Sequence, residues 1–235
     1  MKIDPNAFLP PPVIAAHIQG ALQVRKPLAL IRIGDGEALT LSQGTVCSVS
    51  YVASQGFLRE AGVMVPDFTA RARVADAVRL ADFVGVAARR DLPNFAPLTE
   101  AAFAYLGLHP RRLCDCCINY ALQGHGLLIP LLRGKRLFLV NRRWIAWAEA
   151  LKRLYGLCVV GGAFVDHFGQ IATALTAAEH QRFDVALVAA GVPATWLSVA
   201  LARRKKIVAL DVGRLADLMI GITCQEKPGS ISTSQ

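Results

Sequence analysis

Two carboxylates at the end of an apolar run are the clearest chemical signal in the sequence. The run "LALIRI", residues 28–33, leads directly into Gly34, Asp35, Gly36 and Glu37. Burial of a carboxylate is costly unless the group is paired, hydrogen-bonded or bound to a metal. Two hard oxygen donors at this spacing could hold one divalent cation, which would bridge the phosphates of a nucleotide. The glycines would let the backbone approach such a ligand closely.

The same residues also have a purely structural interpretation. Asp35 would cap a following helix and Glu37 would favour its first turn, and the spacing alone does not separate this from metal binding. A dinucleotide fingerprint fits less well, because the third glycine is missing and Asp35 would face the pyrophosphate. The position about 20 residues further on, where an acid would hold a ribose, is occupied by residues 54–56, "SQG". A Rossmann-type dehydrogenase or methyltransferase is therefore the weaker alternative.

Buried strands alternating with helices must position these side chains. We expect strands at 27–33, 82–88, 112–118, 135–141, 157–162, 183–191 and 206–213, and a strand or extended loop at 46–52. We expect helices at 13–26, 38–44, 67–81, 97–108, 119–132, 143–156, 168–181, 193–205 and 214–221. Continuous apolar strands alternating with helices indicate a parallel sheet that is covered on both faces. We predict one Rossmann-like α/β domain at 13–222, a doubly wound, mainly parallel sheet, with an irregular arm at 1–12 and a disordered tail at 223–235.

This topology sorts the polar residues between two edges of the sheet, and ligands bind at the carboxyl ends of the strands. The residues that follow strands are Asp35, Glu37, Arg89, Asn141, Arg142, Gly191, Asp211, Gly213 and Arg214. The basic runs at 111–112, 135–136 and 203–206 precede strands instead. They should lie near helix C-termini, where the helix dipole favours cations, in a structural or solubilising role.

The composition excludes several classes of protein. Of the 235 residues, 54% are hydrophobic and 18% are charged, which indicates a globular chain. We expect no transmembrane segment, because no stretch reaches the ~18 apolar residues of a spanning helix, and no signal peptide, so we predict a cytoplasmic protein. The net charge of +9 favours anionic partners. Split basic clusters without interleaved aromatics argue against nucleic acid, and the apolar excess suggests a homo-oligomer.

Three of the six cysteines, Cys114, Cys116 and Cys117, lie close together in "LCDCCIN". Small thiols buried in a central strand are a better interpretation than a metal site, because no second Cys/His pair has a suitable spacing. Trp144 and Trp147 are predicted core residues, whereas Trp196 is a candidate for stacking on a base or sugar.

The stretch "LALIRIGDGEALTLSQG" resembles the signature of the GT-D-type glycosyltransferases. The likeness continues in "ADFVGVAARRDLPNFAPL", in "CINYALQGHGLL" and "LLRGKRLFLVNRR", and in "FDVALVAAGVPATWLSVALARRKKIVALDVGRLADLM", and it spans roughly residues 20–220. It implies transfer of a sugar from a nucleoside diphosphate sugar, with a UDP-sugar favoured, to an acceptor hydroxyl. The acceptor would be a glycan, a glycoprotein or a cell-surface precursor. The resemblance also implies a divalent ion, Mn or Mg, at the catalytic pair Asp35 and Glu37.

The resemblance carries further roles to matching positions. Arg32 would orient the two acids, and the substrate would meet Gly34, Gly36, Arg89, Asn141, Arg142, Gly191, Asp211 and Gly213. Arg214 stands where the family pattern leads us to expect histidine, and no general base is evident, although Asp166 and His167 follow a strand. A non-catalytic, nucleotide-binding module of transferase type is therefore a second alternative.

Overall fold

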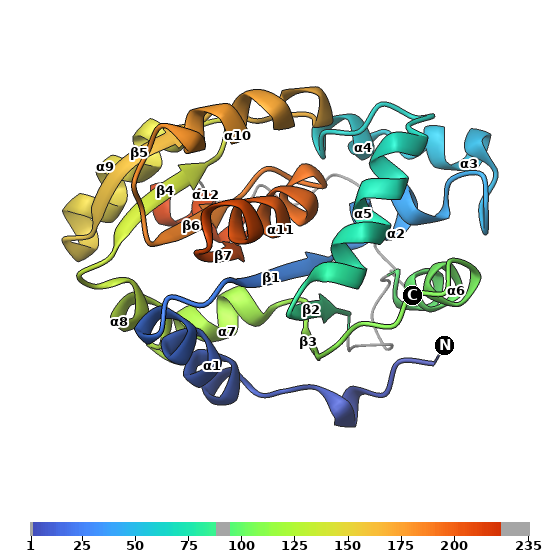
Figure 1. Cartoon of the computed structure of the whole chain (residues 1–235). Helices are drawn as coiled ribbons and strands as arrows, with labels where there is room; N and C mark the ends of the chain where they lie inside the picture. Colours follow the sequence, from blue (N-terminus) through green and yellow to red (C-terminus); the bar gives the residue numbers. More distant parts are fainter. Residues whose placement is uncertain (1, 88–94, 222–235) are drawn as a thin grey trace, which may run out of the picture.

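The computed structural model describes residues 2–87 and 95–221, which form a sheet of seven parallel strands (Figure 1). The strands are β1 (Leu28–Ile33), β2 (Phe83–Val86), β3 (Leu113–Asp115), β4 (Arg136–Val140), β5 (Cys158–Ala163), β6 (Val185–Val188) and β7 (Val208–Asp211). Their order across the sheet is β3-β2-β1-β7-β6-β4-β5. The predicted doubly wound parallel sheet is confirmed.

Helices cover both faces of this sheet. The helices are η1 (Pro5–Ala7), α1 (Pro11–Gln23), α2 (Asp35–Ser42), α3 (Val49–Ala53), α4 (Phe57–Glu60), α5 (Phe68–Leu80), α6 (Ala96–Tyr105), α7 (Ile118–Gly124), α8 (Leu128–Leu132), α9 (Trp144–Tyr155), η2 (Phe168–Gln170), α10 (Ile171–Glu179), α11 (Pro193–Lys205) and α12 (Leu215–Ile220). In Figure 1, α5 and α11 lie on one side of β1, and α1 and α7 lie on the other. Helix α10 joins the first layer, and α8, α9 and α12 join the second.

The strand β1 shows why the sequence folds in this way. Ala29, Ile31 and Ile33 belong to the core under α5 and α11, whereas Leu28 and Leu30 belong to the core under α1 and α7. Alternate residues of a strand point to opposite faces, so a continuous apolar run fills both cores. Arg32 continues the series of Leu28 and Leu30 and is the first polar residue at the carboxyl end of the strand.

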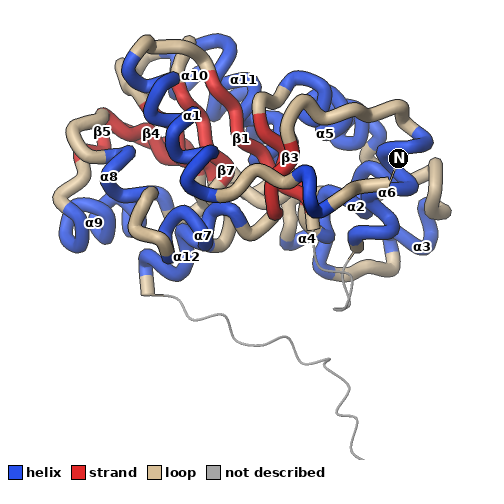
Figure 2. The backbone as a smooth tube through the Cα atoms, turned by 90° about the horizontal axis from the view of Figure 1, so that it is seen from below, coloured by secondary structure: helices blue, strands red, loops and turns tan. Residues whose placement is uncertain are grey.

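Helices α2, α3, α4 and α6 gather at one end of the molecule (Figure 2). Leu39, Val52 and Leu58 form a small separate core among them, with Phe95 and Leu98 packed against it. Helices α2, α3 and α4 of this helical cap follow β1 and α6 follows β2, so the cap lies beside the carboxyl ends of the strands. The cap therefore adds a wall to the edge where parallel sheets bind ligands.

Several local predictions were wrong in detail. The segment at 46–52 is not a strand: α3 begins after Ser48, whose hydroxyl accepts the N–H of Tyr51 (3.2 Å). The helix expected from residue 38 begins at Asp35. The arm predicted as irregular contains η1, and α1 already begins at Pro11.

Two further predictions concern the chain ends and the membrane. The predicted tail at 223–235 lies outside the described residues. Among the described helices, none combines the length and the apolar character that crossing a bilayer requires.

Candidate functional site

Arg32 and Asp211 join the ends of two neighbouring strands by a buried ion pair. The Arg32 guanidinium lies 3.2 Å from the Asp211 carboxylate, and the Asp211 side chain is 3% exposed. Arg32 also donates to the carbonyl oxygen of Cys116 (3.2 Å), while its buried Nε has no hydrogen-bond partner. The carboxyl ends of β1 and β7 and the residue after β3 are thereby tied together.

Gly213 is required by this arrangement. Its N–H donates to Asp211 (3.0 Å), and its φ of +46° lies in the left-handed region. A Cβ at this position would overlap the Arg32 guanidinium. Only glycine therefore fits the backbone conformation and the close approach of the arginine.

Glu37 is the second acid near Arg32. It occupies the third position of α2, and its carboxylate accepts the N–H of Gly34 (2.9 Å). Burial, and then the charge of Asp211, raise the pKa of Glu37 to about 7, against the lowering effects of Arg32 and the backbone N–H groups. Burial also raises the pKa of Asp211, although Arg32 lowers it. One guanidinium thus serves two carboxylates, that of buried Asp211 and that of half-buried Glu37, and formal negative charge is left uncompensated.

Asp35 lies differently from Glu37. It is the first residue of α2, and it is exposed rather than part of the cavity described below. Residues two apart on a helix do not face each other, so the two acids of the motif diverge. The structural interpretation is confirmed for Glu37, which lies in the first turn and satisfies a backbone N–H; Asp35 lies one residue inside the capping position, which Gly34 occupies.

A cavity of about 320 Å³ opens at this edge of the sheet. Eight of the twelve predicted site residues line it: Arg32, Glu37, Asn141, Arg142, Gly191, Asp211, Gly213 and Arg214. Asp35, Gly34 and Gly36 do not, and Arg89 lies outside the described residues. Arg32 and Arg214, 182 positions apart in the chain, therefore meet in one cavity, as the topology predicts.

Two of the predicted residues shape the wall of this cavity. The Asn141 amide donates to the carbonyl oxygen of Ala189 (2.6 Å), and its oxygen accepts the N–H of Arg143 (2.6 Å). Gly191 has a φ of +61°, and a Cβ there would collide with the carbonyl oxygen of Ala61. Asn141 and Gly191 therefore join backbone segments.

The helical cap contributes a part of the cavity wall that no motif in the sequence indicates. Phe57, Glu60 and Ala61 line the cavity, and the Ala61 carbonyl accepts the N–H of Val192 (2.9 Å). This segment is held through main-chain groups, which leave no side-chain motif. A sequence signal does exist in Gly62, whose φ is +88° and whose Cβ would collide with the carbonyl oxygen of Asp166.

Three more acids and two arginines complete the charges of the cavity. Glu60, Asp166 and Asp217 line it together with Glu37 and Asp211, which gives five carboxylates against the guanidiniums of Arg32, Arg142 and Arg214. Arg142 and Arg214 are exposed, and the described part of the chain offers neither of them an ion pair. The formal surplus of two negative charges suits a divalent cation, with two arginines left for anionic groups.

The cysteine and tryptophan predictions need partial correction. Cys114 is buried, but its strand β3 is at the edge of the sheet rather than central. Asp115, Cys116 and Cys117 place ligand atoms within 4.8 Å of one another, the one group of this kind among the described residues. Trp147 is a core residue as predicted, whereas the ring of Trp196 lies under the Arg73 guanidinium (5.5 Å) rather than in the cavity.

Comparisons with known proteins agree with this fold. No curated protein matches the chain. Two solved structures match it over 89% of its length and 78% of theirs, each at 14% identity, with TM-scores of 0.61 and 0.59. They are described as "The highly conserved domain of unknown function 1792 has a distinct glycosyltransferase fold" and as a selenomethionine-substituted structure of domain of unknown function 1792. A family model, the GT-D fold-like domain, matches residues 9–219, and the chain therefore belongs to this glycosyltransferase-fold family.

Proposed function

We propose that the protein is a metal-dependent glycosyltransferase that uses a nucleoside diphosphate sugar, with a UDP-sugar favoured, and an acceptor hydroxyl. The observation that carries the proposal is the charge of the cavity: five carboxylates against three guanidiniums. A bare diphosphate would be repelled by this surplus of negative charge. A diphosphate that arrives with a divalent cation would be accepted.

The residues present fit Mn or Mg. Both ions prefer oxygen ligands, and the carboxylates of half-buried Glu37 and buried Asp211 share a single guanidinium, that of Arg32. Glu37 and Asp211 would hold the ion in the cavity, whereas Asp35, the other expected metal ligand, is exposed and does not line the cavity. When bound, the ion would act as a Lewis acid that stabilises the negative charge of the leaving diphosphate.

The other residues would bind and orient the substrates. Arg142 and Arg214 would donate to phosphate oxygens, because each is a free guanidinium on the cavity wall among the described residues. In the transfer, the bond from the sugar C1 to the phosphate oxygen breaks, and a bond from C1 to the acceptor oxygen forms. We assign the acceptor's proton to Asp166, a carboxylate of the cavity that is 45% exposed and is accompanied by His167 at 3.7 Å.

Thermal shift assays with UDP, GDP, NAD and S-adenosylmethionine, each with and without Mn, test this function. We expect stabilisation by UDP only when Mn is present, since a ligand at a hundred times its dissociation constant adds about 2.7 kcal/mol. Glu37→Gln should abolish this response, whereas Asp35→Asn should leave it, because Asp35 does not line the cavity. Asp76→Asn, which removes an exposed acid from α5, is the matched control and should leave it unchanged.

The alternatives give different results in the same experiment. Metal-independent stabilisation by NAD or by the methyl donor would overturn the transferase proposal in favour of a dehydrogenase or methyltransferase. The non-catalytic module would bind UDP with Mn but would release no free sugar or UDP from a UDP-sugar in the presence of candidate acceptors. A cytoplasmic location and a homo-oligomeric state stay predictions.

A further inference from the structure

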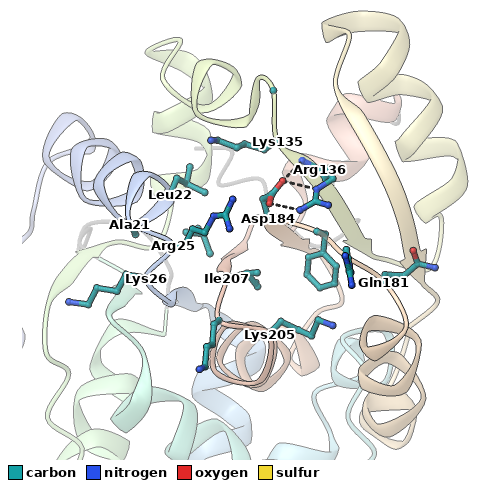
Figure 3. Close-up of a pocket in the computed structure, with 15 residues that line it drawn as sticks. Ala21, Leu22, Arg25, Lys26, Lys135, Arg136, Gln181, Asp184, Lys205 and Ile207 are labelled. Carbon is teal, nitrogen blue, oxygen red and sulfur yellow. Dashed lines mark hydrogen bonds and ion pairs between the residues drawn. The ribbon is translucent and has the colours of Figure 1, made fainter.

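A second cavity lies at the opposite edge of the sheet, where the strands begin. It has a volume of about 560 Å³, and its polar lining is dominated by seven basic residues: Arg25, Lys26, Lys135, Arg136, Arg182, Lys205 and Lys206. Asp184 is its one acid. Figure 3 shows Arg25 reaching from beyond the end of α1 toward the pair formed by Arg136 and Asp184.

The acid does not neutralise this cluster. Asp184 accepts from the Arg136 guanidinium at 2.9 Å and 3.1 Å, and also from the Arg136 backbone N–H at 2.9 Å. Lys205 donates to the carbonyl oxygen of Glu179 (3.1 Å). The remaining five cations, Arg25, Lys26, Lys135, Arg182 and Lys206, have no ion pair within the described ranges.

The backbone provides an independent observation. Arg25 and Lys206 have φ angles of +53° and +55°, and they are the only non-glycine residues with positive φ among those described. Both follow helices, α1 and α11, at the kind of position where glycine is the common and less strained choice. The chain therefore keeps two basic side chains in unfavourable backbone conformations, and both of them line the same cavity.

The helix dipole does not account for the cluster. Cations stabilise the negative end of a helix dipole when they lie within the last turn of the helix. The last turn of α11 already contains Arg203, Arg204 and Lys205. Helix α1 has no basic residue in its last turn, and Arg25 lies beyond its end. Lys135 and Arg182 come from the loops before β4 and β6. Four segments of the chain thus place basic groups around one cavity.

We propose that this amino-edge cavity binds a small anion that bears at least two phosphate groups and no nucleobase, because its lining has no exposed aromatic ring that could stack on a base. The volume lies within the range of small-molecule sites, and the wall is concave rather than flat, which suits a compact ligand better than a bilayer surface. The apolar floor of Ala21, Phe183 and Ile207 lacks the exposed aromatic rings on which a nucleic acid would stack. The unpaired cations would meet the phosphate oxygens, bidentately at the arginines.

Calorimetric titration with inorganic pyrophosphate tests this site. The buffer contains a chelator, so that a metal-dependent site cannot bind the ligand. The double variant Arg25→Gly, Lys206→Gly removes two cations and suits the backbone at both positions, so its melting temperature should not fall. We expect its affinity for pyrophosphate to drop at least tenfold. The matched control Lys152→Gln, Arg153→Gln removes two exposed cations from the last turn of α9 and should change affinity less than twofold.

Three outcomes would overturn the proposal: no binding by the unaltered protein, equal weakening in both double variants, or tight binding of a DNA duplex or of phosphatidylglycerol vesicles that pyrophosphate does not displace. The third outcome would assign the surface to a polyanion or a membrane. The thermal shift produced by UDP with Mn should be the same in the Arg25→Gly, Lys206→Gly variant. The proposal for this cavity and the proposed function are therefore tested independently.

Discussion

Replacement of Glu37 by glutamine should make the protein more stable and less active. The pKa of Glu37 in the folded chain is about 7, against an ordinary value of 4.5, mainly because the carboxylate is buried. The folded state therefore binds a proton more tightly than the unfolded state. The contribution of Glu37 to the free energy of unfolding is fully present below pH 4.5 and is lost as the pH rises through 7. At about 1.4 kcal/mol for each pH unit of difference, the whole loss is about 3 kcal/mol.

Glutamine keeps the structural role of the residue while it removes the charge. Its side-chain oxygen can accept the N–H of Gly34, as the carboxylate does at 2.9 Å. We expect urea denaturation in the presence of a chelator to give a larger free energy of unfolding for Glu37→Gln than for the unaltered protein. The difference should be about 3 kcal/mol at pH 8 and about 1 kcal/mol at pH 5. The Glu60→Gln control removes an exposed acid from the same cavity and should change stability by no more than about 0.5 kcal/mol.

The reasoning is refuted if Glu37→Gln is no more stable than the unaltered protein at pH 8, or if the difference does not grow with pH. Agreement would mean that the folded chain retains a destabilising charge at neutral pH. Proteins keep such groups where function needs them, because local rules are broken mainly at functional sites. Loss of the response to UDP with Mn in the same, more stable variant would connect this cost to metal binding.

Two other substitutions test how the cavity is built. Gly213→Ala should destabilise the protein by about 3 kcal/mol or more in urea denaturation, because its Cβ displaces Arg32 from the ion pair with Asp211. The control is Gly134→Ala, at a position where φ is +70° and nothing lies within 4 Å of the added Cβ. This control should lose only the ~1 kcal/mol of backbone strain. Asn141→Ala should cost about 2 kcal/mol, measured in the same way, since it leaves the buried carbonyl oxygen of Ala189 without its 2.6 Å partner. An unchanged stability in either case would show that the wall does not depend on these contacts.

The sheet and its ligand edge could be predicted from the sequence because they depend on patterns that are repeated along the chain. Most strands of the sheet are dominated by short apolar runs, and the side chains that follow such runs must meet at one edge of a parallel sheet. This logic brought Glu37, Asn141, Arg142 and Asp211 into one cavity without knowledge of the strand order. It could not reveal that Arg32 pairs with Asp211, 179 residues away, because that depends on β7 lying beside β1.

The helical cap was harder to predict, for a physical reason. Its segments are short, and a single hydroxyl, that of Ser48, begins the helix where apolar residues suggested a strand. Ala61 contacts the loop after β6 through its carbonyl oxygen. Main-chain contacts leave the side chain free to vary, so residue types carry almost no information about them. Asn141 lines the predicted cavity, but the sequence could not show that both ends of its amide are occupied by backbone groups.

The positive net charge of the chain is distributed unevenly between the two edges of the sheet. A net charge of +9 indicates anionic partners but not where they bind. The cavity at the carboxyl edge is lined by more acids than arginines, whereas the cavity at the amino edge has seven basic residues and one acid. The length of β1, six residues, separates the two edges by about 20 Å, which is beyond the ~10 Å over which salt lets exposed charges interact. Under the two proposals above, each edge would select its own ligand: an anion accompanied by a metal ion where carboxylates gather, and an anion without one where cations gather. A chelator should separate the two, since it would remove nucleotide from the first edge and leave pyrophosphate on the second.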